Sequence, residues 1–333
     1  MRRILTGIKP TGTPHVGNYL GAIRPALRHA ADPALEACYF IADYHALNSV
    51  HDRATMDRLV HEVAATWLAC GLDPTRTLFY RQSDIPEILE LSWILGCFTS
   101  KGWMNKAHAY KAHVDAATAA GEPDVDAGLN MGVYCYPVLM AADILAFDTD
   151  VVPVGKDQVQ HIEIARDIAQ RLNHTYKADL LRLPAASTEE DVAVVPGLDG
   201  RKMSKSYDNT IPLFAPTKQL KKTIGRMVTD SSPPEVPKDP ATSTIFQLYR
   251  LFATPAETAA LRARYEAGIG WGDAKAELHR MLDEHIAPAR ARYEALMADR
   301  EQVDALLADG ARRARAIAGP VLQRVRRAIG IER

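Results

Sequence analysis

The sequence predicts an α/β protein: a Rossmann-like, doubly wound parallel sheet with a C-terminal helical domain. Short apolar runs alternate with segments of helical periodicity in the first half of the chain, as expected for βαβ units. The later part changes to long segments rich in Ala, Arg, Glu and Leu, which indicate helices. We therefore expect a sheet domain over residues 1–212 and a helical domain over 213–299, with the last helices, about 300–333, packed back onto the sheet domain.

The strands and helices of the sheet domain follow one another in order. The run 38–42 is apolar on both faces, which is typical of a strand in a sheet covered by helices. Leu59, Val63 and Trp67 fall on one face of a helix. Strands are expected at 3–7, 38–42, 78–80 and 150–154, and helices at 17–27, 56–70, 85–98, 136–147 and 156–172.

Three other segments have less regular patterns. Residues 116–123 have the composition of an exposed loop or a frayed helix. Residues 191–213 are punctuated by Gly and Pro and have a strand-like pattern. Everything after Pro216 is expected to be helical.

The composition is that of a soluble globular protein, with 47% apolar and 24% charged residues among 333. The formal net charge of -1 provides no global positive field for nucleic acid, so any RNA contact must come from a local patch. The tail holds one candidate patch, which consists of Arg312, Arg313, Arg315, Arg324, Arg326 and Arg327. A group of arginines like this is more often a solvated helix face than an RNA contact.

Neither a metal site nor a membrane segment is predicted. The four cysteines form no C-x-x-C pair, so no protein metal site is expected. The start of the chain has no apolar region of the signal-peptide type. No apolar run approaches the ~20 residues that a membrane helix needs. We expect a cytoplasmic protein.

The first motif lies between the first expected strand and the first expected helix, at residues 6–18. Ligands of parallel sheets bind at the carboxyl ends of strands, and a helix N-terminus attracts phosphate. Gly12 and Gly17 would let a nucleotide approach the backbone, and His15 and Asn18 could contact its phosphates or base. The same residues are equally compatible with a plain glycine-rich turn that ends in a capping Asn.

The second motif, residues 202–206, reads Lys-Met-Ser-Lys-Ser and follows two glycines. Two lysines on a mobile loop suit adenylation, in which negative charge builds up on the departing pyrophosphate. Taken alone, such a pair is more often a solvated basic turn.

Together the two motifs resemble those of the class I aminoacyl-tRNA synthetases. Residues 15–18, His-Val-Gly-Asn, resemble the His-Ile-Gly-His element of that class, and residues 202–206 match its second element letter for letter. Within the class, the chain is similar to the bacterial-type tryptophanyl-tRNA synthetases over nearly its whole length. The matching blocks are residues 7–22, 43–47, 136–145 and 152–161.

This resemblance implies a tryptophan–tRNA ligase that activates L-tryptophan with ATP and Mg²⁺ and transfers it to tRNA(Trp). It also implies a homodimer, and it places the helical domain on the anticodon side of the tRNA. The residues implied in catalysis are Lys202, Lys205, His15, Asn18 and Lys9. The residues implied in ATP binding are Lys9, Pro10, Thr11, Gly17, Asn18, Gly155, Lys156, Asp157, Val194, Lys202, Met203, Ser204, Lys205 and Ser206.

For tryptophan, the resemblance implies that Asp143 accepts a hydrogen bond from the indole N–H. The chemistry agrees, because an indole nitrogen can only donate and phenylalanine would leave a buried acceptor unpaired. An Asp inside an apolar helix is also unfavourable unless it has a role. The residues implied around the amino acid are Asp143, His45, Tyr136, Met140, Ile144, Val152 and Gln158, with Tyr136 and Gln158 near the α-amino group.

Two lysines depart from the family pattern. Lys9 stands where the family usually has Gln, and Lys156 where it usually has Glu. A lysine ammonium has no acceptor and favours a carboxylate or phosphate. We hypothesise that Lys9 contacts the amino-acid carboxylate or an ATP phosphate.

Three alternatives remain open at this stage. A tyrosyl enzyme of the same class is disfavoured by Asp143 and the opening motif. A small-molecule nucleotidylyltransferase is disfavoured by residues 202–206 and by the long helical second half. A non-catalytic relative is disfavoured by the presence of His15, Lys202 and Lys205.

Overall fold

The computed structural model describes residues 1–188 and 195–332, with the side chain of Asp157 left out of the description. Its centre is a parallel sheet of five strands in the order β3-β2-β1-β4-β5. The strands are β1 (Arg2–Ile8), β2 (Leu35–Ile41), β3 (Leu78–Arg81), β4 (Val151–Pro153) and β5 (Ala185–Ser187). The chain winds outward from β1 first to one side and then to the other. This topology confirms the predicted doubly wound fold and leaves a crevice between β1 and β4.

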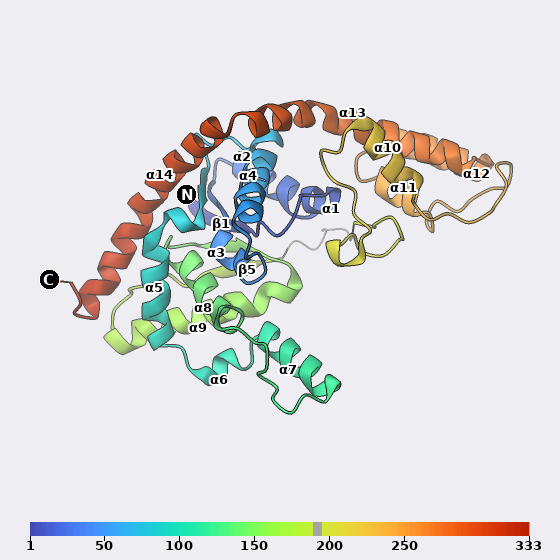
Figure 1. Ribbon diagram of the computed structural model, residues 1–333. Helices are drawn as coiled ribbons and strands as arrows, with labels where there is room; N and C mark the ends of the chain where they lie inside the picture. Colours follow the sequence, from blue (N-terminus) through green and yellow to red (C-terminus); the bar gives the residue numbers. More distant parts are fainter. Residues whose placement is uncertain (189–194, 333) are drawn as a thin grey trace.

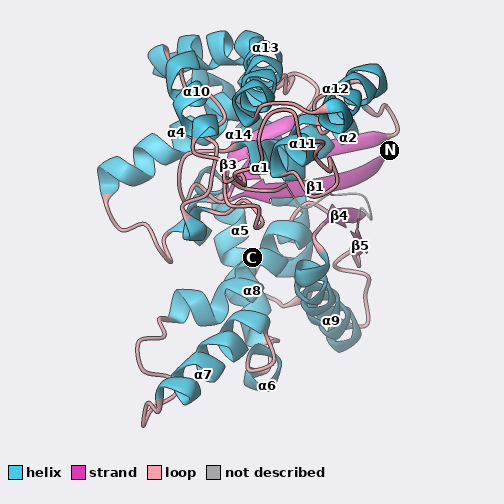
Figure 2. Ribbon diagram, turned by 90° about the vertical axis from the view of Figure 1, so that its right-hand side faces the viewer, coloured by secondary structure: helices cyan, strands magenta, loops and turns pink. Residues whose placement is uncertain are grey.

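Helices cover both faces of the sheet (Figures 1 and 2). Alternate strand residues point to opposite faces: Leu5, Phe40 and Tyr80 pack in one apolar cluster, while Ile4 and Tyr39 pack in another. The helices and helical turns of this region are α1 (Val16–Asn18), η1 (Tyr19–Ile23), α2 (Arg24–Ala31), α3 (Asp43–Ala46), α4 (Arg53–Ala69), η2 (Gln82–Asp84), α5 (Pro86–Cys97), α6 (Lys101–Met104), α7 (His108–Ala120), α8 (Met131–Leu145), η3 (Lys156–Gln158) and α9 (Val159–Tyr176).

The later part of the chain is mainly helical and has its own apolar cluster. That cluster also contains Val16 and Leu20 from the first motif helix and Met203 from the second motif. Both motifs are therefore anchored in one core with the later helices. The elements here are η4 (Lys205–Tyr207), α10 (Thr217–Gly225), α11 (Thr244–Tyr249), α12 (Pro255–Ala267), α13 (Trp271–Ala298) and α14 (Arg300–Ala328).

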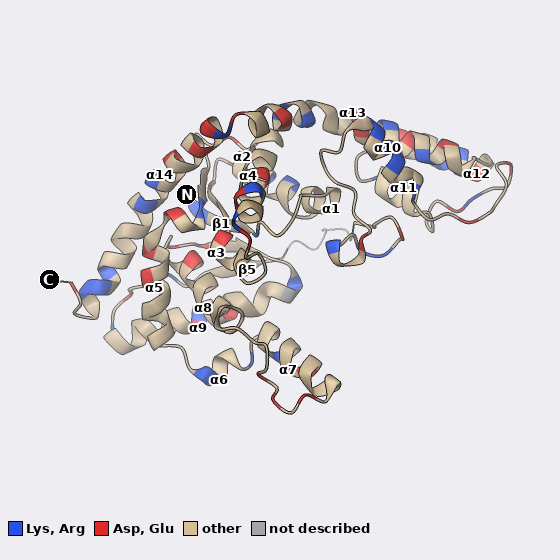
Figure 3. Ribbon diagram, in the orientation of Figure 1, with Lys and Arg blue, Asp and Glu red and all other residues tan. Residues whose placement is uncertain are grey.

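Helices α13 and α14 form a long arc over the molecule, and α14 runs along β3 and α5 (Figure 1). Acidic and basic residues are interspersed along the arc (Figure 3). Arg315, Arg324 and Arg326 pair with carboxylates of other elements, namely Glu87, Asp148 and Glu90.

The remaining tail arginines also have partners in this chain. Arg313 donates to the backbone carbonyls of Pro74 and Thr77, and Arg312 and Arg327 pair with carboxylates of the C-terminal segment. Arg313, Arg315, Arg324 and Arg326 therefore attach α14 to α5 and to the turns after α8 and before β3, whereas Arg312 and Arg327 pair within the C-terminal segment. Because several of these side chains remain largely exposed, an RNA contact in the tail stays a prediction.

The structure decides between alternatives at one segment and corrects the prediction at others. Residues 116–120 are the last turn of α7, which ends at Gly121 with φ 72°, so the helical alternative holds for them and only the following residues form a loop. Helix α8 begins at Met131, earlier than predicted, because the Asn130 side chain caps the N–H of Val133. The strand-like pattern of residues 195–213 produces two isolated β-bridges and no strand. The fifth strand of the sheet, β5, lies upstream of this segment.

The expectation that everything after Pro216 is helical was also wrong for one segment. No helix covers residues 227–242, which include Pro233, Pro234, Pro237 and Pro240. Proline removes a backbone donor and clashes with the preceding turn, which explains this interruption. Over the described ranges, no helix has the length and apolar character required to cross a membrane.

The close packing of α14 on β3 depends on Gly310. A Cβ atom at this position would lie 1.8 Å from the backbone oxygen of Phe79. We expect Gly310→Ala to push α14 from the sheet and to lower the free energy of unfolding by about 1–3 kcal/mol, measured by urea denaturation. Gly319 in the same helix has no such neighbour within 4 Å, so Gly319→Ala should raise the stability by up to about 1 kcal/mol. Equal effects at both positions would contradict the close-packing argument.

Candidate active site

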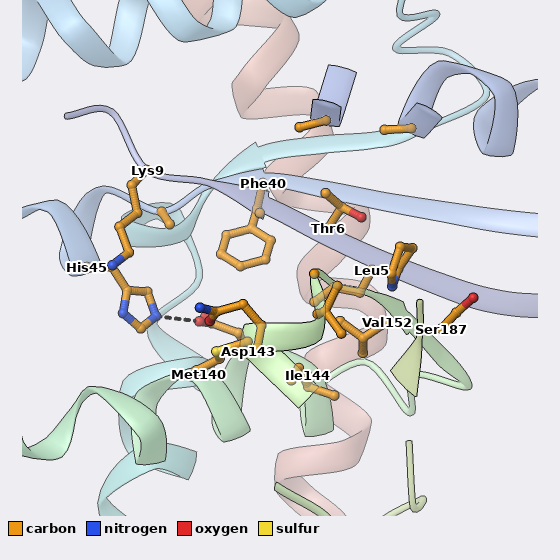
Figure 4. A pocket seen from close by; sticks show the side chains of 18 of the residues that line it. Leu5, Thr6, Lys9, Phe40, His45, Met140, Asp143, Ile144, Val152 and Ser187 are labelled. Atoms are coloured by element: carbon orange, nitrogen blue, oxygen red, sulfur yellow. Dashed lines mark hydrogen bonds and ion pairs between the residues drawn. The ribbon is translucent and has the colours of Figure 1, made fainter. Parts of the chain in front are cut away.

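A cavity of about 460 Å³ opens at the carboxyl ends of β1 and β4, where the sheet topology places the crevice (Figure 4). It is wide enough for a small ligand. The small residues Gly21 and Ala22, from the π-helical turn η1, form part of its wall. All seven side chains predicted to surround the amino acid line it: Asp143, His45, Tyr136, Met140, Ile144, Val152 and Gln158.

Asp143 is the buried acid of this cavity, with only 1% of its surface exposed. One carboxylate oxygen lies 2.9 Å from Nε2 of His45 (Figure 4). The other accepts a hydrogen bond of 2.7 Å from Nε2 of Gln82. Burial raises the pKa of Asp143, while the hydrogen bonds from His45 and Gln82 lower it. The acid is therefore held by two donors from two other elements.

Tyr136 and Lys9 lie on another part of the cavity wall. The Tyr136 hydroxyl is 2.6 Å from Nε2 of His161. Lys9 Nζ lies 5.5 Å from the centre of the Tyr136 ring, and burial lowers the pKa of Lys9. A cation on the wall of this cavity suits an anionic group of a ligand.

The first motif contacts the second motif and the segment that follows it. Val16 N–H donates to the Ile211 carbonyl at 2.9 Å, and Leu213 N–H donates to the Pro14 carbonyl at 3.1 Å, so residues 211–213 pair with the first motif. Gly17 N–H points to the sulfur of Met203 at 3.2 Å. The loop that carries the lysines is thus attached directly to the first βα turn.

Lys205 lies against Gly12 of the first motif. A Cβ atom on Gly12 would be 2.9 Å from Lys205 Nζ, and the φ of Gly12 is +148°, so this position favours glycine. Burial lowers the pKa of Lys205, whereas Glu62 raises it. Glu62 is 7% exposed and accepts a 3.0 Å hydrogen bond from Thr13.

His15 is a neutral group in this arrangement. Its pKa is lowered to about 4, first by burial and then by the positive charge of Lys205. Asn18 accepts a 3.1 Å hydrogen bond from the backbone N–H of His15 and completes a capping box. Asn18 thus caps the first turn of α1 from position N3, with His15 as the N-cap residue, and its contact with a nucleotide stays a prediction.

Some of the residues that were predicted to bind ATP line the cavity, and others lie outside it. Lys9 and Gly155 line the cavity. Pro10, Thr11, Gly17, Asn18, Lys156 and residues 202–206 do not line it. Lys202 is exposed, and Ser204 accepts from the N–H of Ser206. Val194 and the side chain of Asp157 lie outside the description, and the part of the chain that is described holds no cluster of three metal-ligating side chains.

Two polar residues near the site were missed by the sequence argument. Gln82 directly follows β3, so the rule that ligands bind at the carboxyl ends of strands could have indicated it. Glu62 lies within the buried face of α4, where an acidic residue among apolar neighbours was an available signal.

A parallel sheet whose first βα turn meets a Lys-Met-Ser-Lys-Ser loop is the architecture of a class I tRNA synthetase. Residues 1–287 match the family described as tRNA synthetases class I (W and Y). The chain belongs to this family and, within it, to the tryptophan–tRNA ligases, as the following relatives indicate. The predicted family and enzyme class are thereby confirmed.

A tryptophan–tRNA ligase of Pseudomonas aeruginosa is 55% identical over 331 residues, which cover 99% of this chain and 74% of the relative. That of Neisseria meningitidis is 50% identical and is covered over 98% of its length. A crystal structure of tryptophanyl-tRNA synthetase from Campylobacter jejuni, complexed with ADP and tryptophan, has a TM-score of 0.90 and 42% identity. The match covers 98% of this chain and 99% of that one.

The environment of His15 predicts an unusual titration. We expect its imidazole to titrate with a midpoint of about 4 when followed by NMR, with His15→Asn used to assign the signal. Because the folded pKa lies below the ordinary 6.5, the contribution of neutral His15 to stability is complete above 6.5 and is lost as the pH falls toward 4. Lys205→Met should raise the midpoint but leave it below 6.5, since burial is the larger cause. A midpoint near 6.5 in the unmodified protein would disprove this account.

Proposed function

We propose that this chain is a tryptophan–tRNA ligase: it activates L-tryptophan with ATP to tryptophanyl-adenylate and pyrophosphate, and then transfers tryptophan to the 3′ end of tRNA(Trp). The observation that carries the proposal is Asp143, a buried acid on the wall of an apolar cavity at the β1–β4 crevice. The similar Campylobacter jejuni structure, complexed with ADP and tryptophan, supports the choice of ligands.

The cavity suits an indole ring. Met140, Ile144 and Val152 supply apolar surface, and Asp143 supplies the hydrogen-bond acceptor that the indole N–H requires. We assign Tyr136 and Gln158 to the α-amino group and Lys9 to the carboxylate or to an ATP phosphate. Phenylalanine fits the apolar wall but leaves the buried acceptor without a partner, which disfavours it.

The first step requires positioning and charge stabilisation but no side-chain nucleophile. A carboxylate oxygen of tryptophan attacks the α-phosphorus of ATP, the bond from that phosphorus to the bridging oxygen breaks, and pyrophosphate leaves. We propose that Gly155 and Asp157 hold the adenosine and that Mg²⁺ enters with ATP. In the second step, a hydroxyl of the terminal adenosine attacks the mixed anhydride and AMP leaves.

The two motifs would act together on the phosphates. Neutral His15 can donate a hydrogen bond without adding a second charge beside Lys205. Lys205 already lies against Gly12, and exposed Lys202 would close onto the leaving pyrophosphate. Cations that approach as charge develops stabilise the transition state more than the bound substrates.

We assign the helical region 213–299 to the anticodon side of tRNA and place the protein in the cytoplasm. Lys218, Lys221 and Lys222 lie on the exposed face of α10 and would suit contacts to phosphate (Figure 3).

A pyrophosphate-exchange assay with every standard amino acid tests the proposed function. We expect exchange that depends on tryptophan and a fall in kcat/KM for tryptophan of about tenfold to a hundredfold in Asp143→Ala, as for a lost hydrogen bond to a charged group. Asp115→Asn, a change of an exposed carboxylate on α7, serves as the control. Exchange dependent on tyrosine would favour the tyrosyl alternative, and absence of any adenylate would favour a non-catalytic relative. Loss of rate without loss of tryptophan preference would contradict the role of Asp143.

We further propose a homodimer that uses the outer face of α5. Trp93 is 77% exposed and Leu89, one turn earlier, is 40% exposed. Large apolar side chains that lie together on a surface mark contact sites more often than scattered ones.

Trp93→Asp should shift the protein toward monomer at micromolar concentration, measured by light scattering after gel filtration. Val228→Asp is the matched control, because Val228 is 67% exposed on a distant loop. A monomeric unmodified protein would refute the dimer, and a dimer that survives Trp93→Asp would refute this surface.

A further inference from the structure

Gln82 is a buried amide whose position is set by the sheet. It is the first residue of η2, directly after β3, and its side chain is 0% exposed. The carboxyl end of β3 lies on the same sheet edge as those of β1 and β4. The strand therefore delivers this side chain to the wall that carries the amino-acid cavity, although Gln82 does not itself line the cavity.

The only side-chain hydrogen bond of Gln82 among the described residues goes to Asp143. Its Nε2 atom donates to one carboxylate oxygen at 2.7 Å, and its Oε1 atom has no partner among them. The reverse orientation of the amide would place two acceptors face to face. The contact thus explains both the presence and the orientation of the amide.

Asp143 is held from two sides by donors of different elements. His45 of α3 lies 2.9 Å from one oxygen, and Gln82 of η2 binds the other at 2.7 Å. This fixes the plane of a carboxylate on α8 before any ligand arrives. Each oxygen can still accept a second hydrogen bond, so the acid remains available to a donor in the cavity.

The same two donors act on the charge of the acid. Burial raises the pKa of Asp143, and the nearby carboxylate of Asp43 raises it further. Hydrogen bonds from His45 and Gln82 have the opposite effect. Tyr80, buried beside the acid, offers no hydrogen bond to it, and Lys9 and Tyr136 face the same cavity.

Charge matters here because the indole nitrogen only donates. A protonated Asp143 could present an O–H group to the indole N–H, and two donors repel each other. An amide donor favours the ionised acid without adding a net charge beside a neutral ring. A lysine or arginine at this position would add one.

We propose that Gln82 is a specificity-determining positioning residue, whose amide, together with His45, keeps the Asp143 carboxylate oriented and ionised to accept the indole N–H of tryptophan. This inference rests on the proposed tryptophan-activating function and deepens it, because Gln82 acts through Asp143 and does not touch the substrate.

The test compares Gln82→Met, which keeps the size of the side chain and removes the donor, with the unmodified enzyme in pyrophosphate exchange. We expect kcat/KM for tryptophan to fall about tenfold to a hundredfold while the KM for ATP stays unchanged. The acid limb of the pH profile of kcat/KM for tryptophan should move to higher pH, because removal of the donor raises the pKa of Asp143 and lets it take up its proton earlier. A packing defect alone would leave the position of this limb unchanged.

A double-mutant cycle with Asp143→Asn separates action through the acid from any other role. In the Asp143→Asn background, Gln82→Met should have no further effect on kcat/KM for tryptophan. If the Met variant does not fold, judged by thermal denaturation, Gln82→Glu of similar shape replaces it. That variant should lose more activity at neutral pH, since two carboxylates would then share one site.

Three results would overturn the role of Gln82. The first is an unchanged kcat/KM for tryptophan in the folded Gln82→Met variant, and the second is an equal fall in kcat/KM for tryptophan when Gln82→Met is added to Asp143→Asn. The third is a rise in the KM for ATP of the same size as the fall in kcat/KM for tryptophan. Failure of the proposed function itself looks different, because the unmodified enzyme would then show no exchange that depends on tryptophan.

Discussion

The parallel pairing of β1 with both β2 and β4 is the constraint on which the rest of the structure depends. Because the chain leaves β1 toward β2 and later returns to β4 on the other side, the connections diverge and a crevice forms between β1 and β4. The cavity, the first motif and the acid on α8 all meet at this edge. Elements far apart in sequence thereby contribute to one site.

Desolvation of charge is the second common feature of the site. Asp143 and His15 are buried, whereas Lys9 and Lys205 keep exposed surface, and partial desolvation shifts the pKa of all four toward the neutral form. Neighbours oppose this effect at two of them: two donors hold Asp143, and Glu62 favours the charged form of Lys205. The proposed binding of a neutral ring beside a triphosphate fits this separation of an acceptor wall from a cationic loop.

The two long C-terminal helices pack against elements on both sides of the site. Helix α14 lies against β3, which leads directly into Gln82, and Gly310 permits the close approach. Helix α13 packs on α4, the helix that carries Glu62. The helical region therefore supports the elements that carry Asp143's partner Gln82 and Glu62, while Arg315 and Arg324 attach α14 to α5 and to the turn after α8.

The order of the first four strands, the two motifs and the family could be predicted from sequence, because each depends on local patterns: apolar periodicity, glycine at a turn, and a five-residue motif. The lining of the cavity by residues such as Asp143 and Tyr136 followed from a resemblance that places whole blocks together. The start of α8 at Met131 was misjudged because a capping Asn outweighs average composition, and the short strand β5 was missed.

Only the tertiary structure decided which polar partners surround each charged group. Gln82, His45 and Asp143 come from three separate segments, and their spacing in the sequence does not predict that they form hydrogen bonds with one another. The same holds for Glu62 and Lys205, and for the arginines of α14, whose partners lie across the fold. Local patterns determine which elements form, but the strength of an electrostatic interaction depends on distance and burial, which exist only once the chain has folded.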